Sequence, residues 1–307
     1  METITTILKL QITLLLLITA GAAGKKLGVI TQGFSDGLSK FLMNIVLPCS
    51  IFSSFQTELG DDIWRQSAQI LLVTVAVHIF YILLGAAVYR KSDPDRRAVL
   101  RFAILCPNTN FMGMPVINGI YGSAGVLLLS VALVPARCFV MTVGLSYFLA
   151  GSLSARLKGL FSNPSIWAVF AGAVMLLFRW HLWQPLAKAV SSLGSCNTPL
   201  AMILIGTMLT SLTREMLTDR SVWSFCALRL LIIPLAVALG LRLAGAGGIV
   251  AGVSATMSAL PAGAVTMIYA KAYGRDDVFA AACIIVSVLA SVITIPLVNI
   301  GFSLLFQ

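Results

Sequence analysis

Charged side chains are scarce in this sequence, and acidic ones are the scarcest. Only 10% of its 307 residues are charged, 11 of them acidic and 21 basic. Such a chain lacks the polar surface of a soluble protein, and its 59% hydrophobic content predicts an all-α integral membrane protein. The net charge of +10 does not indicate a nucleic-acid partner, because the basic residues lie in short gaps between apolar stretches.

Motifs for metal, nucleotide and nucleophilic chemistry are also missing. The six cysteines are scattered singly without a Cys-x-x-Cys pair, and the sequence contains no phosphate-binding loop or nucleophile elbow. We therefore expect no cofactor, no metal site and no enzymatic activity. The missing phosphate loop also argues against a self-contained ATP-driven pump.

Long apolar runs fill nearly the whole chain. A transmembrane helix needs about 20 apolar residues, and the sequence offers ten candidates: 3–23, 34–56, 67–89, 99–121, 124–150, 164–183, 185–211, 221–243, 248–271 and 278–305. Loops after odd-numbered spans hold 13 Lys and Arg residues, and loops after even-numbered spans hold four. The positive-inside rule then places the odd loops in the cytoplasm and both termini outside it.

The chain shows a weak internal repeat of about five spans. Three landmarks recur at offsets of 151, 146 and 152 residues: Pro48 with Pro199, Pro115 with Pro261, and Tyr121-Gly122 with Tyr273-Gly274. Because five spans are an odd number, the second copy must be inverted in the membrane. We predict two inverted repeats, residues 1–150 and 164–307, a plan that many secondary transporters share.

Polar and helix-breaking residues interrupt the fourth and ninth spans, at "PNTNFMGMPV" (107–116) and "SALPAGAV" (258–265). Backbone freed by such breaks cannot face lipid, so it must be buried in protein or line a watery cavity. We expect a substrate site here, with hydrogen bonds from Asn108, Thr109, Asn110 and Ser258 and with helix N-termini that attract an anion. Two asparagines beside the matched prolines, Asn44 and Asn197, either line the same cavity or hold helices together.

Arg137 is the deepest cation, thirteen residues from either end of the 124–150 span. No carboxylate lies at similar depth, since all acidic residues except Asp36 fall in loops or at the terminus. Either Arg137 binds the carboxylate of a substrate, or it donates to backbone carbonyls of the broken helices. The roles of Arg229 and His78 are left open, and His78 is either a packing residue or a proton relay.

At these residues the sequence resembles the auxin efflux carrier family, which includes the plant PIN proteins and bacterial malate or malonate permeases. The similarity covers most of the chain, in the strings "GLSKFLMNIVLPCSIFSSF", "NTNFMGMPVINGIYG", "NPSIWAVFAGAVML", "TPLAMILIGTML" and "LPAGAVTMIYAKAYG". Asn110 matches the crossover asparagine of the family, whereas Ser258 and Ala259 stand where PIN proteins carry the second one. Only residues 151–163 remain of the long PIN loop, which favours the bacterial branch.

The resemblance implies ten transmembrane helices in two inverted five-helix repeats, with broken helices 4 and 9 crossing at Pro115 and Pro261 beside an organic-anion site. Helices 1, 2, 6 and 7 would form a scaffold and a homodimer interface. Helices 3–5 and 8–10 would form a transport domain that moves against the scaffold as an elevator. The expected location is the bacterial inner membrane, with lipid around the protein.

We therefore expect a secondary active transporter of small organic anions such as carboxylates. Coupling to a proton or to sodium is left open, as are the substrate and the direction of transport. Two alternatives remain: a sodium-coupled symporter resembling bile-acid transporters, and a membrane sensor that retains a transporter fold. The missing deep carboxylate argues against a sodium/proton antiporter.

Overall fold

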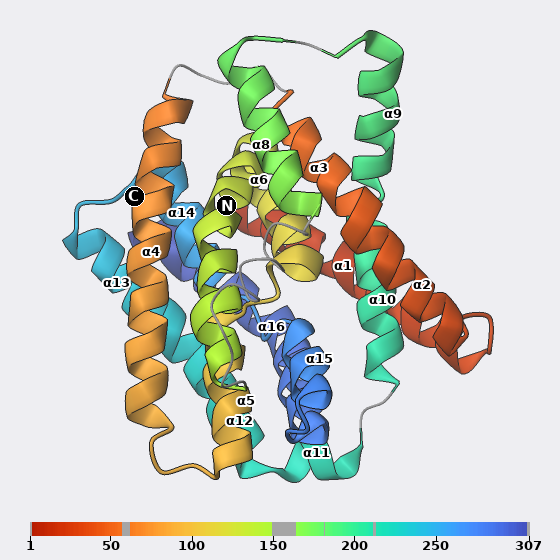
Figure 1. Cartoon of the computed structure of the whole chain (residues 1–307), viewed down its shortest axis with the longest axis vertical. Helices are drawn as coiled ribbons and strands as arrows, with labels where there is room; N and C mark the ends of the chain where they lie inside the picture. The colour runs from red at the N-terminus through yellow and green to blue at the C-terminus, as the bar shows by residue number, and fades with distance from the viewer. Residues whose placement is uncertain (1, 57–61, 149–163, 181, 211–212, 306–307) are drawn as a thin grey trace. The chain divides into compact units, whose positions relative to one another are not determined.

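A computed structural model describes residues 2–56, 62–148, 164–180, 182–210 and 213–305 (Figure 1). Within these ranges the chain is helical and forms no strand beyond one isolated bridge. Six helical segments there are long and apolar enough to cross a membrane: Gln32–Ser54, Ile63–Val88, Thr109–Gly144, Gln184–Leu209, Arg220–Leu243 and Asp277–Phe302. The prediction of an all-helical integral membrane protein is confirmed at this level.

The chain packs as two compact units, and each unit combines stretches from both halves of the sequence. Unit 1 comprises Met1–Ser67, Asn110–Val131 and Phe161–Ser211, and unit 2 comprises Ala68–Thr109, Ala132–Leu160 and Leu212–Gln307. Residues 110–131 therefore group with the first and second spans, although the family resemblance places the fourth and fifth spans with the transport domain.

Unit 1 contains the helices of the matched prolines Pro48 and Pro199 and their neighbours. Its helices are α1 (Glu2–Lys26), α2 (Gln32–Phe41), the π-helix η1 (Leu42–Val46), α3 (Leu47–Ser54), the first part of α6 (Met114–Phe139), α8 (Pro164–Leu177), α9 (Gln184–Ser195) and α10 (Asn197–Leu209). The side chain of Thr31 caps α2 by accepting a hydrogen bond from the N–H of Phe34. Pro48 lies inside the continuous helical segment Gln32–Ser54, two residues after the π-helix η1 ends at Val46.

Small residues let the helices of unit 1 approach closely. A Cβ atom on Gly206 of α10 would overlap the carbonyl oxygen of Ile18, and one on Gly21 of α1 would overlap that of Ile203. A Cβ atom on Gly194 of α9 would lie 2.8 Å from the Cα of Ser50 in α3. Because lipid is as apolar as these side chains, such close backbone packing is a main source of attraction between membrane helices.

Unit 2 is built around the long helix α16 (Asp277–Leu305), which packs against α12, α14 and α15 (Figure 1). Its helices are α4 (Ile63–Val88), α5 (Pro94–Leu105), the end of α6, η3 (Val140–Gly144), α11 (Arg214–Thr218), α12 (Arg220–Ala227), η4 (Leu228–Ile232), α13 (Ile233–Leu243), α14 (Gly248–Ser258), α15 (Val265–Ala272) and α16. The π-helix η2 (Thr109–Gly113) joins the two units along the chain.

Both Tyr-Gly landmarks of the sequence repeat end a helical stretch in the same way. Gly122 has φ 62° and interrupts α6, and Gly274 has φ 63° just after α15. Residues with a Cβ atom rarely adopt a positive φ, so glycine is required at both turns. The recurrence of Tyr-Gly in the sequence thus reflects a recurring backbone turn.

Ion pairs gather three loops at one end of unit 2. Arg96 pairs with Asp219 at 3.0 Å and Asp276 at 3.4 Å, and Arg275 pairs with Asp95. In the sequence these segments follow the stretches predicted as the third, seventh and ninth spans, so the charge count predicts that they share one side of the membrane. Their ion pairs agree with that prediction, and the side that faces the cytoplasm stays a prediction.

Candidate functional site

The two interrupted spans meet through their backbones inside unit 2. The N–H of Asn108 donates to the carbonyl of Pro261 at 2.8 Å, and the N–H of Gly263 donates to the carbonyl of Cys106 at 2.8 Å. Together they form an antiparallel bridge between Pro107 and Ala262. These backbone groups lie outside helices, and each break satisfies groups of the other, which is what a lipid environment demands.

Residues around this crossover are closely packed and mostly buried. A Cβ atom on Gly263 would lie 2.9 Å from the carbonyl oxygen of Cys106. The N–H of Ala262 donates to Oγ of Ser287 on α16 at 3.2 Å, which holds the second break against that helix. The hydroxyl of Thr109 donates to the carbonyl of Pro107 at 3.2 Å. The crossover is thus a fixed structural element held by three helices.

The crossing position differs from the expected one. The structure pairs Pro107 with Ala262, whereas the resemblance implies a crossing at Pro115 and Pro261. Pro115 is the second residue of α6. The π-helix η2 (Thr109–Gly113) runs directly into α6, so Pro115 lies inside the helical segment Thr109–Gly144. Pro107 lies in the irregular backbone before this segment.

Of the nine residues predicted to form the site, five belong to unit 2. Asn108, Thr109, Ser258 and Pro261 are buried at or next to the crossover, and the hydroxyl of Ser258 donates to the carbonyl of Ala255. Arg137 is half-buried in α6, near Cys106 and Tyr269. Since Cys106 is part of the crossover, the positive charge of Arg137 lies near the crossover backbone.

The other four predicted residues, Asn44, Asn110, Pro115 and Asn197, belong to unit 1. The amide of Asn44 donates to the carbonyl of Lys40 in its own helical segment, and its side chain is exposed. The amide of Asn110 lies 3.7 Å from the sulfur of Met43. Asn197 is buried and lines a polar pocket. The structure therefore places the predicted residues in two groups.

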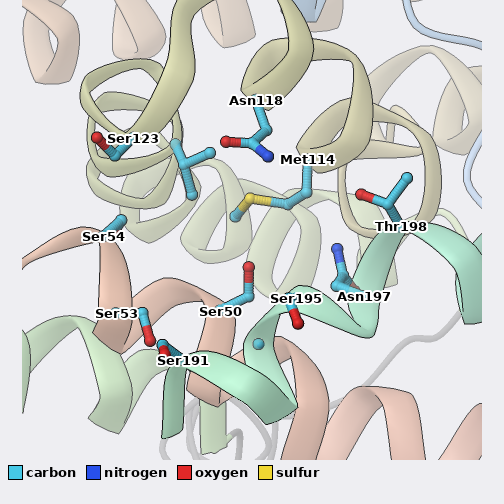
Figure 2. A pocket seen from close by; sticks show the side chains of 12 residues that line it. Ser50, Ser53, Ser54, Met114, Asn118, Ser123, Ser191, Ser195, Asn197 and Thr198 are labelled. Carbon is cyan, nitrogen blue, oxygen red and sulfur yellow. The ribbon is translucent and has the colours of Figure 1, made fainter. Parts of the chain in front are cut away.

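This pocket occupies about 350 Å³ within unit 1, between α3, α6, α9 and α10. Figure 2 shows Asn118 and Met114 of α6 facing Ser50 and Ser195 across it. Its lining residues are Ser50, Ser53, Ser54, Met114, Asn118, Ser123, Val126, Ser191, Gly194, Ser195, Asn197 and Thr198. Among these described residues none is charged, so the pocket offers hydrogen bonds without a preference for an anion.

Sequence reasoning missed most of this lining. The signal was present as helical spacing: Ser191, Ser195 and Thr198 recur at intervals of four and three, which places them on one helix face. Ser195 donates to the carbonyl of Ser192, which leaves its oxygen as an acceptor toward the pocket. Hydroxyls at this spacing are also common where membrane helices pack directly against one another. Only the packing of the four helices shows that these hydroxyls line a pocket.

These observations define a helical integral membrane protein with two interrupted segments that pair through their backbones. The sequence model of the membrane transport protein family matches residues 5–157 and 149–299. The chain belongs to this family, which confirms the resemblance to the auxin efflux carriers.

Relatives from archaea and bacteria agree with this assignment. An uncharacterized transporter of Methanothermobacter thermautotrophicus is 26% identical over 93% of this chain and 95% of its own length. The uncharacterized transporter MJ1031 of Methanocaldococcus jannaschii is 22% identical over 92% and 94%. The uncharacterized transporter YfdV of Escherichia coli K12 is 23% identical over 66% and 67%. The protein is a membrane transporter by family.

Proposed function

We propose that the protein is a secondary active transporter of small organic anions such as carboxylates. The observation that carries this proposal is the backbone crossover of unit 2 with Arg137 beside it. Irregular backbone at membrane depth is a feature of transporter binding sites. A guanidinium cannot lose its charge, and its planar fork suits a carboxylate. The site therefore favours a negatively charged cargo.

The proposed fold is ten transmembrane helices in two inverted repeats. The matched turns at Gly122 and Gly274 and the pairing of the two breaks support this arrangement. The division into two units, each drawn from both halves of the chain, supports an elevator mechanism in which one group of helices carries the cargo past the other. A homodimer in the bacterial inner membrane with both termini outside the cytoplasm is part of the same proposal.

Flux measurements on purified protein in proteoliposomes test this function. We expect uptake of labelled malonate, malate or acetate, and no uptake of the uncharged isostere malonamide. Arg137→Met should reduce carboxylate uptake at least tenfold. Arg101→Met is the matched control, because the guanidinium of Arg101 donates to the carbonyls of Gly85 and Ala86, at 3.2 and 3.3 Å, away from the crossover.

The same vesicles separate the remaining alternatives. Uptake that requires an inward sodium gradient would favour the sodium-coupled symporter, and uptake driven by a proton gradient would favour proton coupling. A folded protein that binds carboxylates without transporting them would overturn the carrier proposal in favour of a sensor. A folded protein that neither binds nor transports any of these anions would overturn the proposed cargo class.

A further inference from the structure

The polar pocket of unit 1 contains a buried amide that has no partner in the described part of the chain. Asn197, at the start of α10, is 4% exposed and lines this pocket. Its side chain makes no hydrogen bond with any residue that the structure describes. Figure 2 shows its amide directed into the pocket, toward the side of α6. Because buried polar groups are normally hydrogen-bonded, this amide indicates an occupant that pairs with it.

Three serine hydroxyls on the wall of the pocket have their protons engaged within their own helices. Ser54, Ser191 and Ser195 each donate to a backbone carbonyl three residues earlier, at 2.6, 3.2 and 2.7 Å. A hydroxyl that donates keeps its lone pairs, so each of these oxygens offers an acceptor to the pocket. A carboxylate group carries acceptors only and cannot pair with them. A ligand with several O–H donors can.

The turn at Gly122 lets both parts of α6 line the pocket. Asn118 precedes this turn and Ser123 follows it. On a straight helix two residues five positions apart point about 140° away from each other, because each residue rotates the chain by about 100°. The φ of 62° at Gly122 breaks the helix between them, and both residues line the pocket. The irregular turn thus adds an amide and a hydroxyl to the same wall.

Backbone packing between α3 and α9 fixes one side of the pocket. A Cβ atom on Gly194 would lie 2.8 Å from the Cα of Ser50, and both residues line the pocket. The two helices are therefore in direct contact there, and the pocket is part of the packed fold. Ligand pockets in proteins are usually pre-formed and measure about 300–1,000 Å³. The volume of about 350 Å³ lies at the small end of this range and suits a small ligand.

We propose that this pocket binds a small uncharged polyhydroxy compound, such as glycerol or a monosaccharide, with the amide of Asn197 as its main hydrogen-bonding group. The described lining contains no charged side chain to balance an ion. A polyol supplies donors to the serine oxygens and both donors and acceptors to the amide. It also reproduces the hydrogen bonds of the waters that it displaces, and their release is favourable in entropy. The site goes beyond the proposed carrier function, since its ligand is neutral and its residues belong to unit 1.

Thermal unfolding of the purified protein tests this site without any transport measurement. The detergent must lack a sugar headgroup, because such a headgroup would compete for the pocket. Glycerol, xylitol and glucose are titrated at millimolar concentrations, well below those at which polyols stabilise proteins by exclusion from the surface. Because a ligand that binds only the folded protein raises its stability, the midpoint should rise with one or more of these compounds and follow a saturation curve. Sodium malonate is titrated in parallel as the anionic comparison.

Asn197→Ala and Asn44→Ala form a matched pair of variants. Asn44 lies in the same unit, but its exposed amide donates to the carbonyl of Lys40 at 2.8 Å and does not line the pocket. Asn197→Ala should raise the half-saturating polyol concentration about tenfold, because the ligand loses the hydrogen bonds of the amide. Asn44→Ala should leave this concentration unchanged. Without polyol, Asn197→Ala should keep the parent midpoint, whereas an asparagine that joins helices would lose stability when truncated.

Several results would overturn the proposal. The absence of a saturable polyol response in the parent rejects the site, and a response that Asn197→Ala retains in full rejects this pocket as its location. A rise that is linear in concentration and equal in all variants is an osmolyte effect and rejects the site as well. If Asn197→Ala does not fold, Ser195→Leu decides. Because Ser195 is exposed to the pocket, a leucine there fills the space and should abolish the polyol response; a retained response rejects the site.

Malonate and flux measurements keep this proposal separate from the carrier function. A malonate response that disappears in Asn197→Ala would assign the pocket to the anionic cargo and overturn the neutral ligand. Saturable polyol binding without carboxylate flux would reject the carrier function and leave the site intact. Carboxylate flux without polyol binding would reject the site and leave the carrier function intact.

Discussion

Replacing Gly263 with alanine should disrupt the crossover of the two breaks. The added Cβ would lie 2.9 Å from the carbonyl oxygen of Cys106, the same oxygen that accepts the N–H of Gly263 at 2.8 Å. Because backbone surrounds this position, the two breaks must separate, which stretches both crossover hydrogen bonds. A buried backbone group left without a partner costs about 1–3 kcal/mol, so the expected loss is about 2–4 kcal/mol of unfolding free energy.

Unfolding by sodium dodecyl sulfate in mixed micelles, followed by circular dichroism, measures this loss. Gly240→Ala is the control, since nothing lies within 4 Å of its added Cβ and the residue is inside α13. Alanine is favoured over glycine in a helix by about 1 kcal/mol, so the control should match or exceed the parent. A Gly263→Ala protein within about 0.5 kcal/mol of the parent would refute the idea that the crossover is close-packed.

Three further changes test other contacts. Gly206→Val should prevent folding or lower the unfolding midpoint in detergent strongly, because the added Cβ would overlap the backbone of α1. Ser287→Ala removes the acceptor of the Ala262 N–H and should cost about 1–3 kcal/mol in the same micelle assay; a neutral result would mean that this N–H has another partner. Arg96→Met should cost below about 1 kcal/mol, since its two ion pairs are partly exposed, and this difference should shrink at 1 M salt. A salt-independent loss would assign Arg96 a packing role on Phe279 instead.

The sequence predicted those structural features that are set by residues close to one another along the chain. Apolar run length predicts helices, and the matched Tyr-Gly pairs correspond to turns at Gly122 and Gly274 that require glycine. An interruption within residues 107–116 was predicted from proline and asparagine content, and the structure has irregular backbone at residues 106–108, before η2 begins at Thr109. The sequence did not tell which proline lies in the break, because Pro107 and Pro115 are both helix breakers and the helix boundary at Thr109 is not visible in the sequence.

The residues of the candidate site were harder to predict from the sequence. Arg137 was found from its depth, whereas the pocket residue Asn118 was not, because nothing local distinguishes it from an asparagine that joins helices. The role of Arg229 was open from the sequence, since an arginine eight residues into a span can reach the membrane interface by extending its side chain. Its full burial excludes that interpretation.

The sequence by itself determined that this chain is a helical membrane protein, where its helices break and which family it belongs to. The bilayer imposes these features, because lipid admits only long apolar helices and penalises every free backbone group. Only the tertiary structure decided that the break at Pro107 pairs with the one at Ala262, and that Arg229 is buried beside Tyr81. Those contacts join residues more than a hundred positions apart, and they depend on how helices pack, which no local pattern encodes.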